Sequence, residues 1–214
     1  MSKKRLIIAS VILCGSLWGL AELGIGEFAW ARNIPRAPIL TAIGILFLVL
    51  ARRIWNVPGS SFALGALAAA FKFLQHPFWG CKVAAVLIVG LTFDITFTLY
   101  EARQRMTNRD ITVGGVVALS AVATLASFLI FGPFAKYVLH NPYWSMAGKM
   151  VDYMVAQGPM ATALAIPAAW AGLKLSERLS LSSESWTSAN WLVYRIAAAG
   201  SGIAGIAAAL ALKY

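Results

Sequence analysis

Charged side chains are scarce in this sequence. Asp, Glu, Lys and Arg make up 12% of its 214 residues, whereas hydrophobic residues make up 60%. Soluble domains usually contain roughly 25% charged residues, and a mean hydropathy of +0.75 leaves too little polar surface to keep such a domain from aggregating. The composition therefore excludes a water-soluble protein and indicates an integral membrane protein.

Acidic residues and cysteines are also few. Eight Asp and Glu oppose 18 Lys and Arg, and the net charge is +10. The basic residues lie in short stretches between apolar runs, where they orient helices, so we expect no nucleic-acid partner. Cys14 and Cys81 are too few for a disulfide framework, and no paired cysteines or His-Glu-x-x-His motif marks a zinc site. We therefore expect no independent metal.

Long apolar segments fill most of the chain, each close to the roughly 20 residues that a membrane-crossing helix needs. They fall at 6–30, 37–51, 59–75, 83–101, 111–132, 148–173 and 190–212. The second and third segments are short and are joined by a basic turn, Arg52 to Gly59, so the count is six or seven. The sequence predicts an all-α membrane protein, with residues 1–214 forming one compact bundle of transmembrane helices.

The basic residues are distributed unequally between the two sides of this bundle. Ten lie on one side: Lys3, Lys4, Arg5, Arg52, Arg53, Arg103, Arg105, Arg109, Lys174 and Arg178. Six lie on the other: Arg32, Arg36, Lys72, Lys82, Lys136 and Lys149, with Lys72 placed to extend outward from a helix end. Cytoplasmic loops are enriched in Lys and Arg, which predicts a multi-pass protein of a prokaryotic inner membrane with a cytoplasmic N-terminus.

Two carboxylates, Glu22 and Asp94, fall deep inside apolar segments. A carboxylate within the bilayer is costly unless it faces a partner or a polar cavity, which makes both candidates for a functional site. Glu22 shares a stripe with Cys14, Trp18 and Gly26, with Gly15 and Gly19 alongside, and ordinary helix packing is the alternative explanation for it. For Asp94 the alternative is hydrogen bonding to nearby hydroxyls.

The segment from His76 to Lys82 is the most informative loop. It places the thiol of Cys81 at the start of the fourth apolar segment, beside a lysine, and both features favour the thiolate. Aromatic residues are concentrated on the same predicted outer side, so we expect any ligand site to open outward. The alternative is an interfacial aromatic loop whose cysteine only packs.

Several of these segments together resemble the substrate-binding S components of energy-coupling-factor vitamin importers. The resemblance rests on Gly15 to Glu22, the Arg52-Arg53 turn with Pro58 to Ser61, Gly90 to Asp94, Gly158-Pro159 and Ile166-Pro167. Within that family, Cys81 is similar to the cysteine of the cobalamin-specific, BtuM-like branch, in which a thiolate serves as an axial ligand of cobalt.

This resemblance implies uptake of cobalamin from the extracytoplasmic side, with Cys81 on cobalt. The implied substrate-binding residues are Cys81, Trp79, Phe78, His76, Tyr143, Trp144, Glu22 and Asp94. It also implies either docking to a transmembrane subunit with ATPases or solitary action, because Gly15-x3-Gly19 replaces the family's Ala-x3-Ala surface. Three other functions stay open: uptake of another vitamin or precursor, a membrane enzyme that modifies a lipid or removes the upper axial ligand of a bound corrinoid, and an assembly or scaffold subunit.

Overall fold

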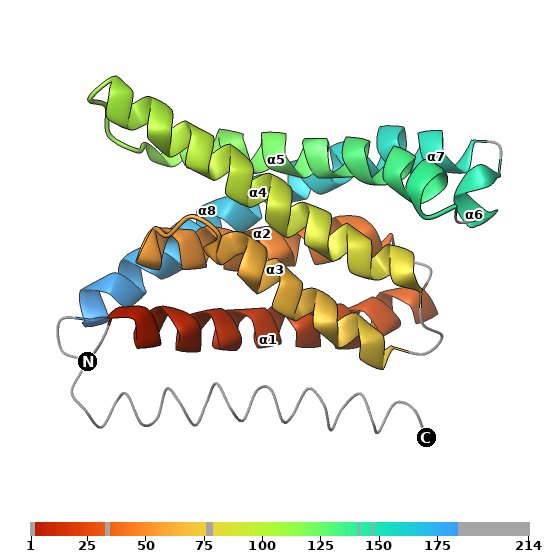
Figure 1. Ribbon diagram of the computed structural model, residues 1–214, viewed down its shortest axis with the longest axis horizontal. Helices are drawn as coiled ribbons and strands as arrows, with labels where there is room; N and C mark the ends of the chain where they lie inside the picture. The colour runs from red at the N-terminus through yellow and green to blue at the C-terminus, as the bar shows by residue number, and fades with distance from the viewer. Residues whose placement is uncertain (1–2, 33–34, 76–78, 141, 147, 184–214) are drawn as a thin grey trace.

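The computed structural model describes residues 3–32, 35–75, 79–140, 142–146 and 148–183 (Figure 1). It is 89% helical and has no strand among the described residues, which confirms the prediction of an all-α protein. The predicted segment at 190–212 lies outside the described residues. The elements are α1 (Lys3–Ala31), α2 (Arg36–Trp55), α3 (Ser60–Ala70), η1 (Phe71–Leu74), α4 (Gly80–Met106), α5 (Val113–Pro133), η2 (Phe134–Val138), α6 (Pro142–Ser145), α7 (Lys149–Asp152), η3 (Tyr153–Gln157) and α8 (Gly158–Ser183).

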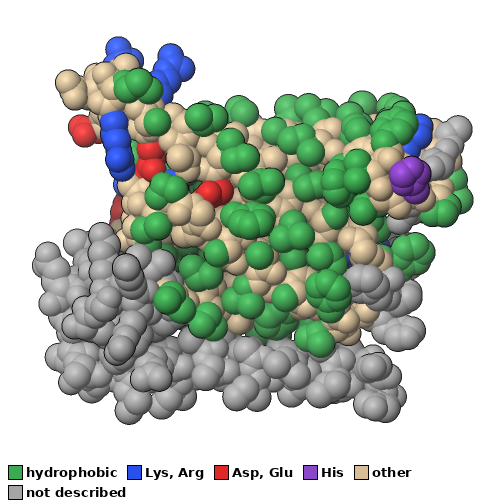
Figure 2. All heavy atoms as spheres, viewed as in Figure 1, with side chains coloured by type: hydrophobic (Ala, Val, Ile, Leu, Met, Phe, Trp, Pro, Cys, Tyr) green, Lys and Arg blue, Asp and Glu red, His purple; other side chains and the backbone are tan. Residues whose placement is uncertain are grey.

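Three of the described helical stretches are long and apolar enough to cross a membrane: Arg36–Trp55, Gly80–Met106 and Val113–Val138. Two further apolar stretches are shorter, Ser10–Gly26 and Ser60–Leu74. The second predicted segment is therefore longer than its sequence pattern suggested, since α2 continues through Arg52 and Arg53. Figure 2 shows hydrophobic side chains over the middle of one face, with Lys and Arg side chains at its two ends and more of them at one end than at the other.

The helices pack around α2, which contacts α8 most extensively, while α3 packs on α4 and α5 packs on both α4 and α8. In the view of Figure 1, α1 and α5 lie along opposite edges with α2, α3 and α4 between them. Ile45, Leu48 and Val49 of α2 are fully buried beside Phe93 and Phe97 of α4. Burial of these apolar side chains holds the two helices in a fixed orientation, which in turn fixes the positions of the polar residues described below.

Two glycines bring α3 and α4 into backbone contact. A Cβ added to Gly65 would lie 3.0 Å from the Cα of Gly90, and a Cβ added to Gly90 would lie 3.1 Å from the Cα of Gly65. Small residues allow such close approach between helices in membranes. The crossing of α3 and α4 thus depends on the absence of a side chain at both positions.

Gly65→Ala should lower the free energy of unfolding by about 1–3 kcal/mol, because the added methyl group forces the two backbones apart. Gly114→Ala is the matched control, since a Cβ at Gly114 meets nothing within 4 Å. Unfolding in detergent, followed by circular dichroism, measures the difference. Equal stability of the two variants would contradict the close crossing.

Candidate ligand-binding site

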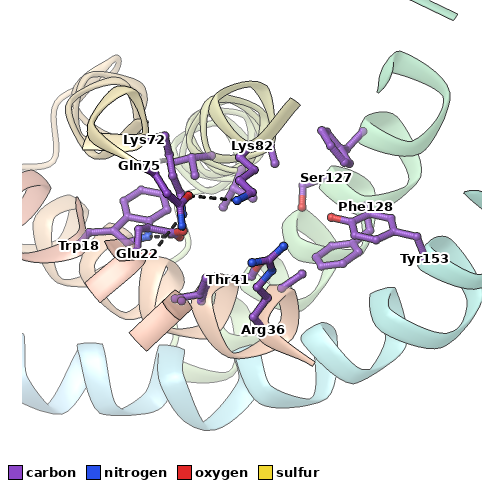
Figure 3. A pocket seen from close by; sticks show the side chains of 17 residues that line it. Trp18, Glu22, Arg36, Thr41, Lys72, Gln75, Lys82, Ser127, Phe128 and Tyr153 are labelled. Atoms are coloured by element: carbon purple, nitrogen blue, oxygen red, sulfur yellow. Dashed lines mark hydrogen bonds and ion pairs between the residues drawn. The ribbon is translucent and has the colours of Figure 1, made fainter. Parts of the chain in front are cut away.

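A cavity of about 110 Å³ lies among α1, α2, η1, α4, α5 and η3. Its lining residues come from the last part of α1 and α5 and the first part of α2 and α4, so the cavity belongs to one end of the bundle. Figure 3 shows the polar and aromatic residues of the lining converging on this space: Trp18, Glu22, Arg36, Thr41, Lys72, Gln75, Lys82, Ser127, Phe128 and Tyr153.

A buried ion pair forms one wall of the cavity. Lys72 Nζ lies 2.7 Å from Glu22 Oε2 and also donates to the backbone oxygen of Glu22 at 3.2 Å. The indole N–H of Trp18 donates to Glu22 Oε1 at 3.1 Å. Trp18 and Glu22 are four residues apart on α1 and therefore share one face. Glu22 is 4% exposed and Lys72 5% exposed, so each charge depends on the other for compensation.

The side chain of Lys72 points inward, not outward as the sequence predicted. Its position near the end of an apolar segment suggested that the side chain extends outward to the membrane surface. Instead, η1 continues α3 as a tighter 3-10 turn, and Lys72 on that turn is buried against Glu22. The carboxylate on α1 is the partner that makes this inward orientation stable, and a single sequence gives no sign of which basic residue will meet it.

The rest of the lining is basic on one side and aromatic on the other. Lys82 Nζ donates to Gln75 Oε1 at 3.3 Å, which joins the start of α4 to the end of η1. Arg36 adds a third basic residue to the lining, whereas Glu22 is the one acidic residue among the lining residues. Across the cavity, the rings of Phe128 and Tyr153 stack with centroids 4.7 Å apart. The arrangement suits a ligand with polar groups attached to a flat apolar body.

Cys81 is not among the residues that line this cavity, but it lies one helical turn from one that does. It precedes Ala85 by one turn of α4, so the two side chains share a face, and Ala85 lines the cavity. Cys81 is partly buried and packs on the same cluster as Tyr153, which is formed by Phe131, Ala135 and Trp144. The thiol is thus placed beside an aromatic cluster, one turn of α4 away from the cavity lining. The described residues contain no group of three or more His, Cys, Asp or Glu that could hold a metal ion.

The predicted aromatic residues occupy different environments. Trp144 is buried and packs edge-on against Phe131, with ring centroids 5.3 Å apart, which places it in the cluster that Cys81 contacts. Tyr143 is exposed and its ring lies 5.9 Å from Lys149 Nζ, and Trp79 is exposed beside the start of α4. The predicted residues His76 and Phe78 lie outside the described residues.

Asp94 is not among the residues that line this cavity. Its carboxylate accepts hydrogen bonds from the backbone N–H of Gly59 at 2.8 Å and of Ser61 at 3.4 Å, at the start of α3. Arg52 forms an ion pair with Asp94 at 3.3 Å and another with Glu101 at 3.1 Å. The structure therefore separates Asp94 from Glu22 and gives Asp94 a partner, Arg52, that the sequence analysis had interpreted only as a loop charge.

Arg52 connects α2 to α4 and to the turn before α3 at the end of the bundle opposite the cavity. Besides its two ion pairs, it donates to Thr98 Oγ1 at 2.8 Å and to the backbone oxygen of Val57, and its guanidinium lies 5.1 Å from the ring centroid of Phe97. The side chain is fully buried. The ion-pair network thus closes the end of the bundle opposite the cavity by joining α2 to α4 and to the turn before α3.

No family model matches the chain, and neither a curated protein nor a solved structure is detectably similar to it. The function is therefore inferred from the geometry of the cavity and from the distribution of charge between the two ends.

Proposed function

We propose that this protein mediates uptake of a vitamin, captured at the extracytoplasmic end of the helical bundle, and that the vitamin is cobalamin. The observation that carries the proposal is the position of the cavity. It lies between helices at the end opposite the fully buried Arg52 and its ion pairs, and it combines Glu22, Lys72 and Lys82 with an aromatic wall. Ligand sites of membrane importers are built in this way, from a few polar groups among packed helices.

The basic residues at the other end support the orientation. Arg53, Arg103, Arg105, Lys174 and Arg178 all belong to the last part of α2, α4 or α8, away from the cavity. An excess of Lys and Arg favours the cytoplasmic side. With that end in the cytoplasm, the cavity faces the side from which a nutrient arrives.

The size of the cavity indicates how a corrinoid would be held. Pockets for drug-sized ligands have volumes of roughly 300–1,000 Å³, whereas this cavity measures about 110 Å³. The cavity would therefore accept one polar substituent, such as an amide arm, beside Gln75 and Lys82. The flat ring would lie outside the cavity against the exposed ring of Tyr143, which packs on Trp144, and the soft sulfur of Cys81 is a suitable donor to cobalt.

The packing of α1 supports solitary action. A Cβ added to Gly15 would lie 2.9 Å from the side chain of Leu67, and one added to Gly19 would lie 2.5 Å from the ring of Phe71. The small residues of α1 thus serve the internal contact with α3 and η1. In our proposal this stripe is not a docking surface for an energy-coupling subunit, and the protein takes up its ligand without one.

A growth assay tests the proposal. Expression in a cobalamin-requiring bacterial strain that lacks its own importer should restore growth on limiting cobalamin. Ala85→Phe should abolish the rescue because the ring fills the cavity one turn below Cys81, whereas Ala118→Phe, at an exposed position of α5, should retain it.

Membrane levels of each variant are measured in parallel. Failure of the wild-type protein to restore growth at normal membrane levels would refute cobalamin uptake. Rescue that Ala85→Phe leaves unchanged would refute the assignment of the cavity as the site.

A further inference from the structure

A second cavity, of about 360 Å³, lies at the basic end of the bundle. It is lined by Tyr100, Arg103 and Gln104 of α4 together with Thr107 and Arg109 of the turn that leads to α5. None of these residues lines the first cavity or takes part in the Arg52 network. The second cavity therefore requires its own explanation.

Positive charge dominates this cavity. Arg103 and Arg109 contribute two guanidinium groups, and none of the lining residues is acidic. Glu101, close by on α4, is buried and paired with Arg52 instead. No ion pair joins Arg103 or Arg109 to a carboxylate within the described ranges. Guanidinium groups bind phosphate oxygens through paired hydrogen bonds, so the lining suits a phosphate group.

The turn after α4 holds the two arginines in a defined arrangement. Asn108 adopts the left-handed conformation, with φ of 49°, which reverses the chain. The backbone N–H of Arg109 then donates to the backbone oxygen of Gln104 at 3.0 Å, and that of Thr107 donates to the backbone oxygen of Arg103 at 3.1 Å. These hydrogen bonds bring the backbone of Arg109 back beside the last turn of α4, which carries Arg103.

Exposed apolar side chains beside Arg103 indicate that the phosphate belongs to a lipid. Leu99, Arg103 and Met106 recur at intervals of four and three residues and therefore form one stripe on α4. Leu99 is 65% exposed and Met106 is 79% exposed. Exposed side chains of this kind can contact acyl chains, whereas a free phosphate ion would gain nothing from them.

We propose that this cavity binds the phosphate headgroup of an anionic phospholipid, with Arg103 and Arg109 on the phosphate and an acyl chain along Leu99. Basic cavities beside membrane-spanning helices attract anionic lipids, which are enriched in the cytoplasmic leaflet. The inference does not depend on the ligand of the first cavity.

Lipid binding to the full-length protein in detergent tests this site. Phosphatidylglycerol and phosphatidylcholine are added separately, and bound lipid is counted by native mass spectrometry. Phosphatidylglycerol should bind selectively, and the double variant Arg103→Gln/Arg109→Gln should weaken its binding roughly 30-fold. The matched control is Arg105→Gln/Arg178→Gln, which removes the same charge from exposed positions outside the cavity and should retain nearly full binding.

Three results would overturn the proposal. Equal binding of both lipids would show that charge does not matter, and equal weakening by the two double variants would show a diffuse surface effect. Competition by inorganic phosphate at concentrations similar to those of phosphatidylglycerol would identify a free-anion site instead. Because the exchanged arginines are exposed, elution of each variant as a folded monodisperse species serves as the check on structure.

Discussion

Replacing Arg52 with Met should lower the free energy of unfolding by about 3–5 kcal/mol, one of the two largest effects we expect in this protein. The substitution retains an apolar side chain but removes the guanidinium that compensates Asp94 and Glu101. Both carboxylate side chains are largely buried, 13% and 6% exposed. Without Arg52, two buried negative charges would remain without this positive partner, and Asp94 would keep only its hydrogen bonds from the start of α3.

Arg53→Met is the matched control for this prediction. Arg53 adjoins Arg52 in the sequence but is exposed, so its replacement should change stability by less than about 1 kcal/mol. Chemical unfolding in detergent, followed by circular dichroism, compares the two variants. Equal destabilisation would show that the buried network contributes nothing beyond the charge of the α2 terminus.

The second large effect concerns the thiol of Cys81. Protein purified from cells supplied with cobalamin should be coloured, and Cys81→Ser should change the visible absorption spectrum and strongly reduce cobalamin uptake. The reason is chemical, since a hydroxyl is a much poorer donor than a thiolate to a transition metal. Absorption spectroscopy of the purified protein and uptake of labelled cobalamin by cells measure the two effects.

Cys14→Ala provides the control for the thiol. Cys14 is buried in the main apolar core and is not among the residues that line the cavity, so its replacement should leave the spectrum unchanged. A membrane-impermeant thiol reagent should also label Cys81 in intact cells. A colourless wild-type protein, or labelling of Cys81 only after the membrane is permeabilised, would contradict ligand capture at Cys81.

The longest apolar helices could be predicted from the sequence because hydrophobic run length is a local property, although three of the six or seven predicted crossings are long and apolar enough in the described residues. The segments predicted at 83–101 and 111–132 correspond to α4 and α5, with ends displaced by a few residues. Glu22 could also be identified as a candidate, because a carboxylate in an apolar run requires compensation. Its partner Lys72 could not, because the contact joins residues 50 positions apart and depends on the packing of α1 against η1.

Arg52 and Arg53 show the limit of local patterns most clearly. Both residues were interpreted as charges of one cytoplasmic turn, yet Arg52 is buried and Arg53 is exposed. Adjacent residues on a helix point about 100° apart, so one can face the core while the next faces outward. Only the position of α4, with Asp94 and Glu101 on the facing side, determines which arginine turns inward.

The two π-helical turns, η2 and η3, help to set the shape of the cavity. The turn η2 follows the part of α5 that lines the cavity. The turn η3 begins with Tyr153, whose ring forms part of the aromatic wall. Wide turns of this type are often found at functional sites, and converting one to an ordinary helical turn rotates the residues that follow. Because Tyr153 is the first residue of η3, a change in this turn would alter the stacking of its ring on Phe128 and with it the aromatic wall, whereas the ion pairs of Arg52 hold the far end independently of it.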